Sequence, residues 1–90
     1  MQGKTKSGFE YDVDDRILKD WRFTLALTKC QKGEGLEKLQ GAQDVIELML
    51  GKKGAEQFIT HIAEQHDGYA DSEVVLSEVK EIFESKIPKN

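Results

Sequence analysis

The chain has 90 residues, which is enough for one domain but too few for two hydrophobic cores. Hydrophobic residues make up 38 % of the chain and charged residues 33 %, a composition typical of a folded domain and not of a disordered segment. The formal net charge of −4 disfavours nonspecific binding to nucleic acid, and the single cysteine excludes an internal disulfide.

The N-terminal part of the chain predicts one short strand. Residues 1–8 are polar and contain two glycines and two lysines, so we expect them to form a flexible lead-in. In the next segment Phe9, Tyr11 and Val13 alternate with acidic residues, the period of two that is typical of a strand with one buried face. A second strand is not evident. The segment could therefore pair with an unrecognised partner, pair across a subunit boundary, or pack on helices as an extended arm.

The first helix is predicted to begin at Asp14 or Asp15, whose side chains can accept hydrogen bonds from free backbone N–H groups. It should end near Gln31. Two apolar stripes run along this helix. The first contains Ile17, Leu18, Trp21 and Leu25, and the second contains Phe23, Leu27 and Cys30. The helix either packs on both sides or uses one stripe as an interface, and we expect Trp21 to lie in the core.

A second helix is predicted over residues 36–50, after a break at Gly33 and Gly35. Its apolar residues cover about half of the helix circumference, which is typical of a buried helix. Leu48 projects outside this apolar arc. Gly51 is a natural C-terminal cap and should end the helix.

Two more helices complete the predicted fold. The third covers residues 55–66 and has one apolar stripe. The fourth begins at Asp71 or Ser72 and ends before a frayed tail at residues 88–90. Together the elements predict a mainly α fold, a compact four-helix domain over residues 9–87 with a short N-terminal extended or β segment.

The sequence offers weak signals for catalysis or metal binding. Cys30 lies near a predicted helix C-terminus, where the helix dipole destabilises a thiolate, so we expect a structural cysteine. His61 and His66 are five residues apart and do not share a helix face, unlike metal-binding histidines at i and i+4. The aspartates around the first helix are explained by capping. We therefore predict no catalytic residue, no cofactor and no metal.

Hydropathy bears on where the protein acts. No apolar segment approaches the roughly 20 residues that span a bilayer. The N-terminal residues also lack the apolar stretch of a secretory signal. The sequence therefore predicts a cytoplasmic protein with no membrane partner.

Several segments, taken in order, carry a resemblance to a known family. They are GFEYDVD at 8–14, DW at 20–21, a glycine break, LMLG at 48–51 and EVKEIFE at 78–84. In the order and spacing of these segments, the chain resembles the small tail assembly chaperones of long-tailed phages and prophages of Gram-positive bacteria. The resemblance covers roughly residues 8–84.

The resemblance implies a protein that does no chemistry. Members of the family bind the tape measure protein in the bacterial host cytoplasm while the tail tube polymerises around it. A candidate partner surface consists of side chains that exceed what a simple apolar stripe needs, namely Phe23, Leu27, Cys30 and Leu48.

Two alternative functions belong to other classes. A small enzyme would need a nucleophile with a base or a pair of carboxylates in a pocket, and the spacings here support neither. A small acidic helical regulator of a host or phage protein would carry a dense carboxylate face. Here the acidic residues and lysines are interspersed along all the predicted helices, which weakens this alternative. Self-association is compatible with either function, but its symmetry is not evident from the sequence.

Overall fold

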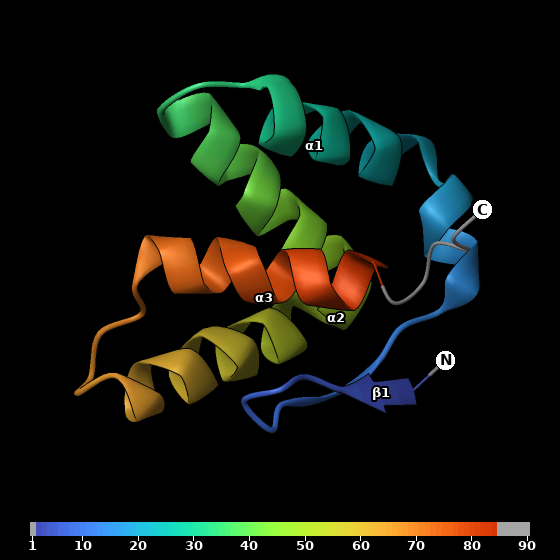
Figure 1. Cartoon of the computed structure of the whole chain (residues 1–90). Helices are drawn as coiled ribbons and strands as arrows, with labels where there is room; N and C mark the ends of the chain where they lie inside the picture. Colours follow the sequence, from blue (N-terminus) through green and yellow to red (C-terminus); the bar gives the residue numbers. More distant parts are fainter. Residues whose placement is uncertain (1, 85–90) are drawn as a thin grey trace.

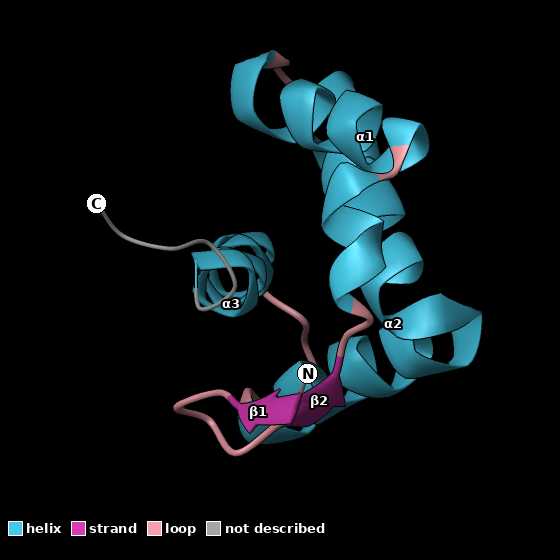
Figure 2. Ribbon diagram, turned by 90° about the vertical axis from the view of Figure 1, so that its right-hand side faces the viewer, coloured by secondary structure: helices cyan, strands magenta, loops and turns pink. Residues whose placement is uncertain are grey.

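The computed structural model of this chain describes residues 2–84, most of which belong to three α-helices (Figure 1). These are α1 (Trp21–Lys32), α2 (Leu36–Gln65) and α3 (Ser72–Glu84). α1 packs on the first half of α2, and α3 lies in the angle between the two halves of α2, as Figures 1 and 2 show. The three helices confirm the prediction of a mainly α fold. None of these described helices is apolar over a length that would cross a membrane.

The prediction of four helices is wrong, because the second and third predicted helices are joined in α2. The join is a sharp bend at Gly51, whose backbone has φ 79° and ψ 166°. Glycine adopts a positive φ at little cost because it has no Cβ. The sequence indicated correctly that the helix is interrupted at Gly51. However, a single non-helical residue makes the bend, and the helix resumes at once without a separate connecting turn.

The first predicted helix is also divided, because two aspartates each cap a helix of their own. Asp14 accepts a hydrogen bond from the backbone N–H of Arg16 (2.9 Å) and begins the short 3-10 helix η1 (Asp15–Lys19). Asp20 accepts one from the backbone N–H of Arg22 (2.8 Å) and begins α1. The pKa of both carboxyl groups is lowered, chiefly by the hydrogen bonds from the arginine side chains. For Asp14 the pKa falls to about 2. Each charged carboxylate thus favours a separate helix start.

The polar N-terminal segment is not a free lead-in, because it forms the first strand of a hairpin. β1 (Gln2–Lys4) pairs antiparallel with β2 (Glu10–Asp12), and Gly3 lies opposite Tyr11. The Tyr11 ring covers Gly3 so closely that a Cβ at this position would collide with it. The flexible lead-in expected at residues 1–8 is therefore wrong over the strand. Three alternatives were open for the predicted strand. The structure shows the first of them, pairing with a partner strand that the sequence did not reveal.

The core consists of side chains from the inner faces of all three helices and from the segment after β2. Its largest fully buried side chains are Phe23, Phe58, Ile46, Ile62, Ile82, Val13 and Val45. Phe58 contacts Phe9 edge to face, with 5.0 Å between the ring centroids. The segment after β1 and the helix α3 thus pack against the middle of the chain.

The orientation of α1 is opposite to the one predicted from its stripes. Phe23 and Ala26 are buried, whereas Trp21 is 73 % exposed and Leu25 is 47 % exposed. The prediction that Trp21 lies in the core is wrong. The reason is a close crossing with α2, where Gly41 packs directly on the backbone of α1 at Ala26. The small residues at the crossing face inward and turn Trp21 to the outside.

The start of α3 agrees with the sequence. The side chain of Asp71 accepts a hydrogen bond from the backbone N–H of Glu73 (2.9 Å), as predicted for a helix that begins at Asp71 or Ser72. α3 is described as far as Glu84. The predicted remainder of this helix and the tail at residues 88–90 lie outside the described residues.

Candidate protein-binding groove

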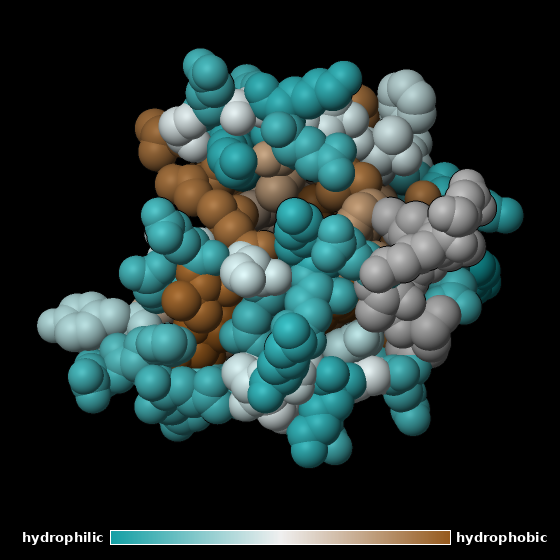
Figure 3. Space-filling model, viewed as in Figure 1, coloured by the Kyte–Doolittle hydropathy of each residue, from teal (hydrophilic) through white to brown (hydrophobic). Residues whose placement is uncertain are grey.

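A groove of about 510 Å³ lies between α1, the first half of α2 and α3. Figure 3 shows hydrophobic side chains gathered in the hollow between α1 and α3. All three helices contribute apolar side chains to its lining, which are Leu27, Val45, Leu76, Val79 and Phe83. The size lies within the range of protein sites that hold a ligand or the side chains of a partner.

The packing of the core sets the direction of the groove-lining side chains. On α1, Phe23 is anchored in the core, so Leu27, one turn later, faces α3. Val45 and Val79 are buried and form part of the lining, while Leu27 and Phe83 are partly buried against the core. Leu76 differs from these apolar neighbours in its contact with the core.

Leu76 is half-buried, but among the described residues it is not one of the side chains packed against the core. It also lines a second hollow of about 250 Å³, between α2 and the start of α3. Leu39, which is 45 % exposed, lies in the wall of that hollow. Leu76 therefore separates two neighbouring apolar hollows and contributes more to this surface than to the core.

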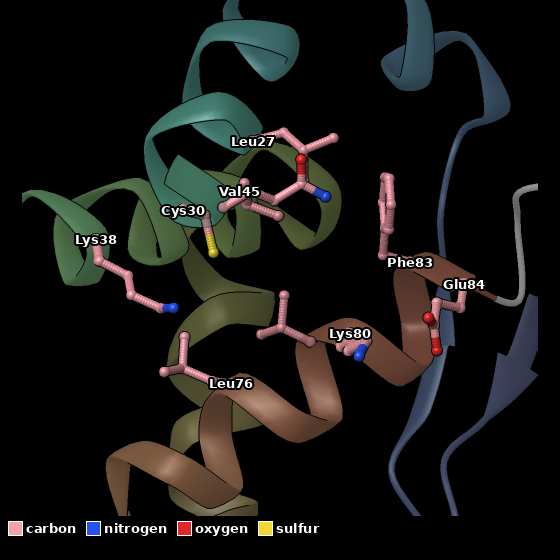
Figure 4. A pocket seen from close by; sticks show the side chains of 10 residues that line it. Leu27, Cys30, Lys38, Val45, Leu76, Lys80, Phe83 and Glu84 are labelled. Carbon is pink, nitrogen blue, oxygen red and sulfur yellow. The ribbon is translucent and has the colours of Figure 1, made fainter. Parts of the chain in front are cut away.

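Charged and polar side chains surround the larger hollow. Lys38 extends from α2, whereas Lys80 and Glu84 extend from α3, and Gln31 lies on α1 (Figure 4). Within the described part of the chain, neither lysine amine forms an ion pair with a carboxylate. The groove thus has an apolar lining and two positive charges at its edge.

Cys30 places its sulfur in the groove, as Figure 4 shows. Burial raises the pKa of the thiol, and the nearby ammonium group of Lys38 lowers it by a smaller amount. The thiol therefore stays protonated at neutral pH, a form that is a poor nucleophile. No histidine is among the described residues that line the groove. In this setting the cysteine acts as a small apolar side chain.

The structure brings together only part of the predicted partner surface. Leu27 and Cys30 both line the groove. Phe23 is 1 % exposed and packs against Phe83, with 6.0 Å between the ring centroids, so it belongs to the core and not to a surface. Leu48 is partly buried against the core and does not line the groove. The α3 side chains of the groove were not among the residues predicted for the partner surface.

A second group of polar side chains ties the hairpin to the helices. The turn between β1 and β2 places Ser7 against α2 and α3, where its hydroxyl donates to Glu78 Oε1 (2.5 Å). Since a serine hydroxyl has one proton, the contacts of Ser7 Oγ with His61 Nε2 and Thr5 Oγ1, both 3.1 Å, must be donated to it. His61 therefore does not act as a base toward Ser7. The cluster is suited to holding the hairpin in place.

Replacing Ser7 by alanine should lower the free energy of unfolding by about 1–2 kcal/mol, because the buried carboxylate of Glu78 loses a donor. Urea unfolding followed by circular dichroism measures the loss. Ser77→Ala is the matched control, since Ser77 is exposed on α3. An equal effect of the two substitutions would argue against the tie between hairpin and helices.

Other signals of function are few. Among residues 2–84, no three His, Cys, Asp or Glu side chains lie together in a way that could hold a metal ion. Comparison of the chain with protein-family models, with curated proteins and with solved structures finds no match. The groove between the three helices is therefore the feature of the molecule from which a function can be proposed.

Proposed function

We propose that this chain is a non-catalytic chaperone of phage or prophage tail assembly, which binds the tape measure protein in the host cytoplasm. The observation that carries the proposal is the groove lined by apolar side chains from α1, α2 and α3. Grooves of this kind bind amphipathic helices, which present apolar side chains at i, i+3, i+4 and i+7. The resemblance of the sequence to tail assembly chaperones supports the same function.

The mechanism is temporary covering of apolar surface. A tape measure protein is a long helical chain with exposed apolar stripes, and such stripes cause aggregation unless another protein covers them. One groove of about 510 Å³ accepts only a few side chains, so each contact is weak enough to reverse. Tube subunits can then displace the chaperone as the tail grows.

Co-expression tests the function directly. The DNA around the gene is sequenced, and the product of the next long reading frame is expressed with and without this chain. The expected result is a long, helical neighbour that stays soluble and copurifies only when the chain is present. A neighbour that is soluble alone and does not copurify would contradict the proposal.

Leu76→Ser should weaken the binding of the tape measure protein roughly tenfold, because a half-buried leucine in the groove loses its apolar contact with the partner. The stability of the chain should fall by less than for a core leucine, since this side chain is not packed against the core. Copurified tape measure protein and the thermal unfolding midpoint are measured together.

The matched control is Leu36→Ser. Leu36 is 83 % exposed at the start of α2 and lines neither hollow, so this variant should bind normally. If both serine variants bind as well as the parent chain, the groove is not the binding surface.

A further inference from the structure

We propose that the groove selects an amphipathic helix whose apolar stripe is flanked by carboxylates, which pair with Lys38 and Lys80. The inference rests on the proposed function, because it names the chemistry of the partner segment that binds in the same groove. It adds a charge preference that apolar contacts alone would not give.

The two lysines lie on different walls of the groove. Lys38 comes from the first half of α2 and Lys80 from α3, and both side chains are exposed (Figure 4). Neither ammonium group is paired with a carboxylate in the described part of the chain. The influence of Lys38 on the thiol of Cys30 places its charge close to the apolar lining.

The local charge contrasts with that of the whole chain. The net charge is −4, yet the charged residues that line the groove are Lys38, Lys80 and Glu84, which sum to a positive charge. A helix with acidic side chains beside its apolar stripe would place carboxylates near the two amines. Such complementarity steers association and disfavours partners with the opposite pattern.

The shape of the surface favours a helix over a compact ligand. The groove lies beside α3, whose 13 residues extend about 20 Å, and Leu76 separates it from the second hollow. A helix that crosses Leu76 can place one apolar side chain in each hollow. A single small molecule would fill only one of them.

Two model helices provide the test. Both are fluorescein-labelled peptides about 18 residues long, roughly five helical turns, with the same leucine stripe. One carries glutamates beside the stripe and the other carries lysines at the same positions. Binding to the full chain is measured by fluorescence anisotropy. We expect the glutamate peptide to bind at least about tenfold more tightly at low salt, and the difference to shrink as salt screens the charges.

Charge reversal on the protein makes the test specific. The double variant Lys38→Glu/Lys80→Glu should invert the preference and bind the lysine peptide more tightly. The matched control is Lys52→Glu/Lys53→Glu, which changes the net charge equally at exposed residues that do not line the groove. This control should keep the preference for the glutamate peptide.

Several results would overturn the inference. They are equal binding of the two peptides, binding of neither peptide, and inversion of the preference by the control variant. Tighter binding of dodecanoate than of the glutamate peptide would also overturn it, because the groove would then suit a lipid.

The proposed function is tested separately. Failure of the peptide experiment leaves co-expression with the tape measure protein unaffected. Conversely, a glutamate preference without tape measure binding would support the charge selection and reject the proposed function.

Discussion

Replacing Phe23 by alanine is expected to lower the free energy of unfolding by about 3–5 kcal/mol. The side chain is 1 % exposed and contacts Phe83, so it joins α1 to α3 as well as filling the core. Removal of the ring leaves a cavity that the neighbouring helices could fill only by moving closer together, which their packing elsewhere opposes. Small domains are stable by only about 5–15 kcal/mol, so the variant should unfold at a much lower urea concentration.

Trp21→Ala is the matched aromatic substitution on the same helix. The Trp21 side chain is 73 % exposed, so its loss should change the free energy of unfolding by less than about 0.5 kcal/mol. Circular dichroism in urea serves for both variants, since it does not depend on the tryptophan. A larger loss of stability from Trp21→Ala than from Phe23→Ala would mean that α1 is turned the other way.

Gly41→Val should destabilise the chain by about 3 kcal/mol, at the upper end for overpacked sites. A Cβ at Gly41 would lie 2.6 Å from the backbone nitrogen of Cys30 and 2.9 Å from the carbonyl oxygen of Ala26. Backbone atoms of a helix cannot rotate away, so α1 would have to separate from α2. Thermal unfolding followed by circular dichroism measures the effect.

The control for this crossing is Gln40→Val, at the preceding and exposed position of α2. The valine slightly lowers the helix propensity at Gln40, whereas it raises the propensity at Gly41, so a larger loss of stability at Gly41 can come only from the contact with α1. Comparable unfolding midpoints for the two valine variants would show that α1 and α2 are not in close contact at Gly41.

The sequence predicts well what depends on local chemistry. The period of two at Phe9–Val13, the cap at Asp71 and the break at Gly51 were all read from neighbouring residues, and each marks a real feature of the chain. A helix over residues 55–66 was predicted after Gly51, but its direct continuation from the bend was not. A glycine with positive φ can end a helix or bend it, and the packing of the two halves of α2 decides between these outcomes.

The inner face of α1 could not be predicted from its own residues. The stripe with Trp21 and the stripe with Phe23 are similarly apolar, and the contact with Gly41, distant in sequence, determines which one is buried. The groove could be predicted only in part, because it also depends on contacts between helices. Leu27 and Cys30 were predicted as surface candidates and both line the groove, but a half-buried side chain such as Leu76 has the same periodicity as a core residue.

The hairpin was missed because its first strand has no apolar period and because its ties are long-range. Gly3 pairs with Tyr11 through backbone and ring contacts that a polar sequence does not reveal. Ser7 and Glu78 are 71 residues apart, and the backbone N–H of Lys6 donates to Glu81 across 75 residues (2.9 Å). Contacts of this separation are not visible in any local window of sequence.

These ties have a consequence for synthesis on the ribosome, where the chain emerges from its N-terminus. The hairpin segment leaves the ribosome well before its partners Glu78 and Glu81, which are 71 and 75 residues later than Ser7 and Lys6. α1 and the first half of α2 are neighbours in sequence and can pair earlier. The hairpin should therefore reach its final place after α1 and the first half of α2 have paired, although it is translated before them.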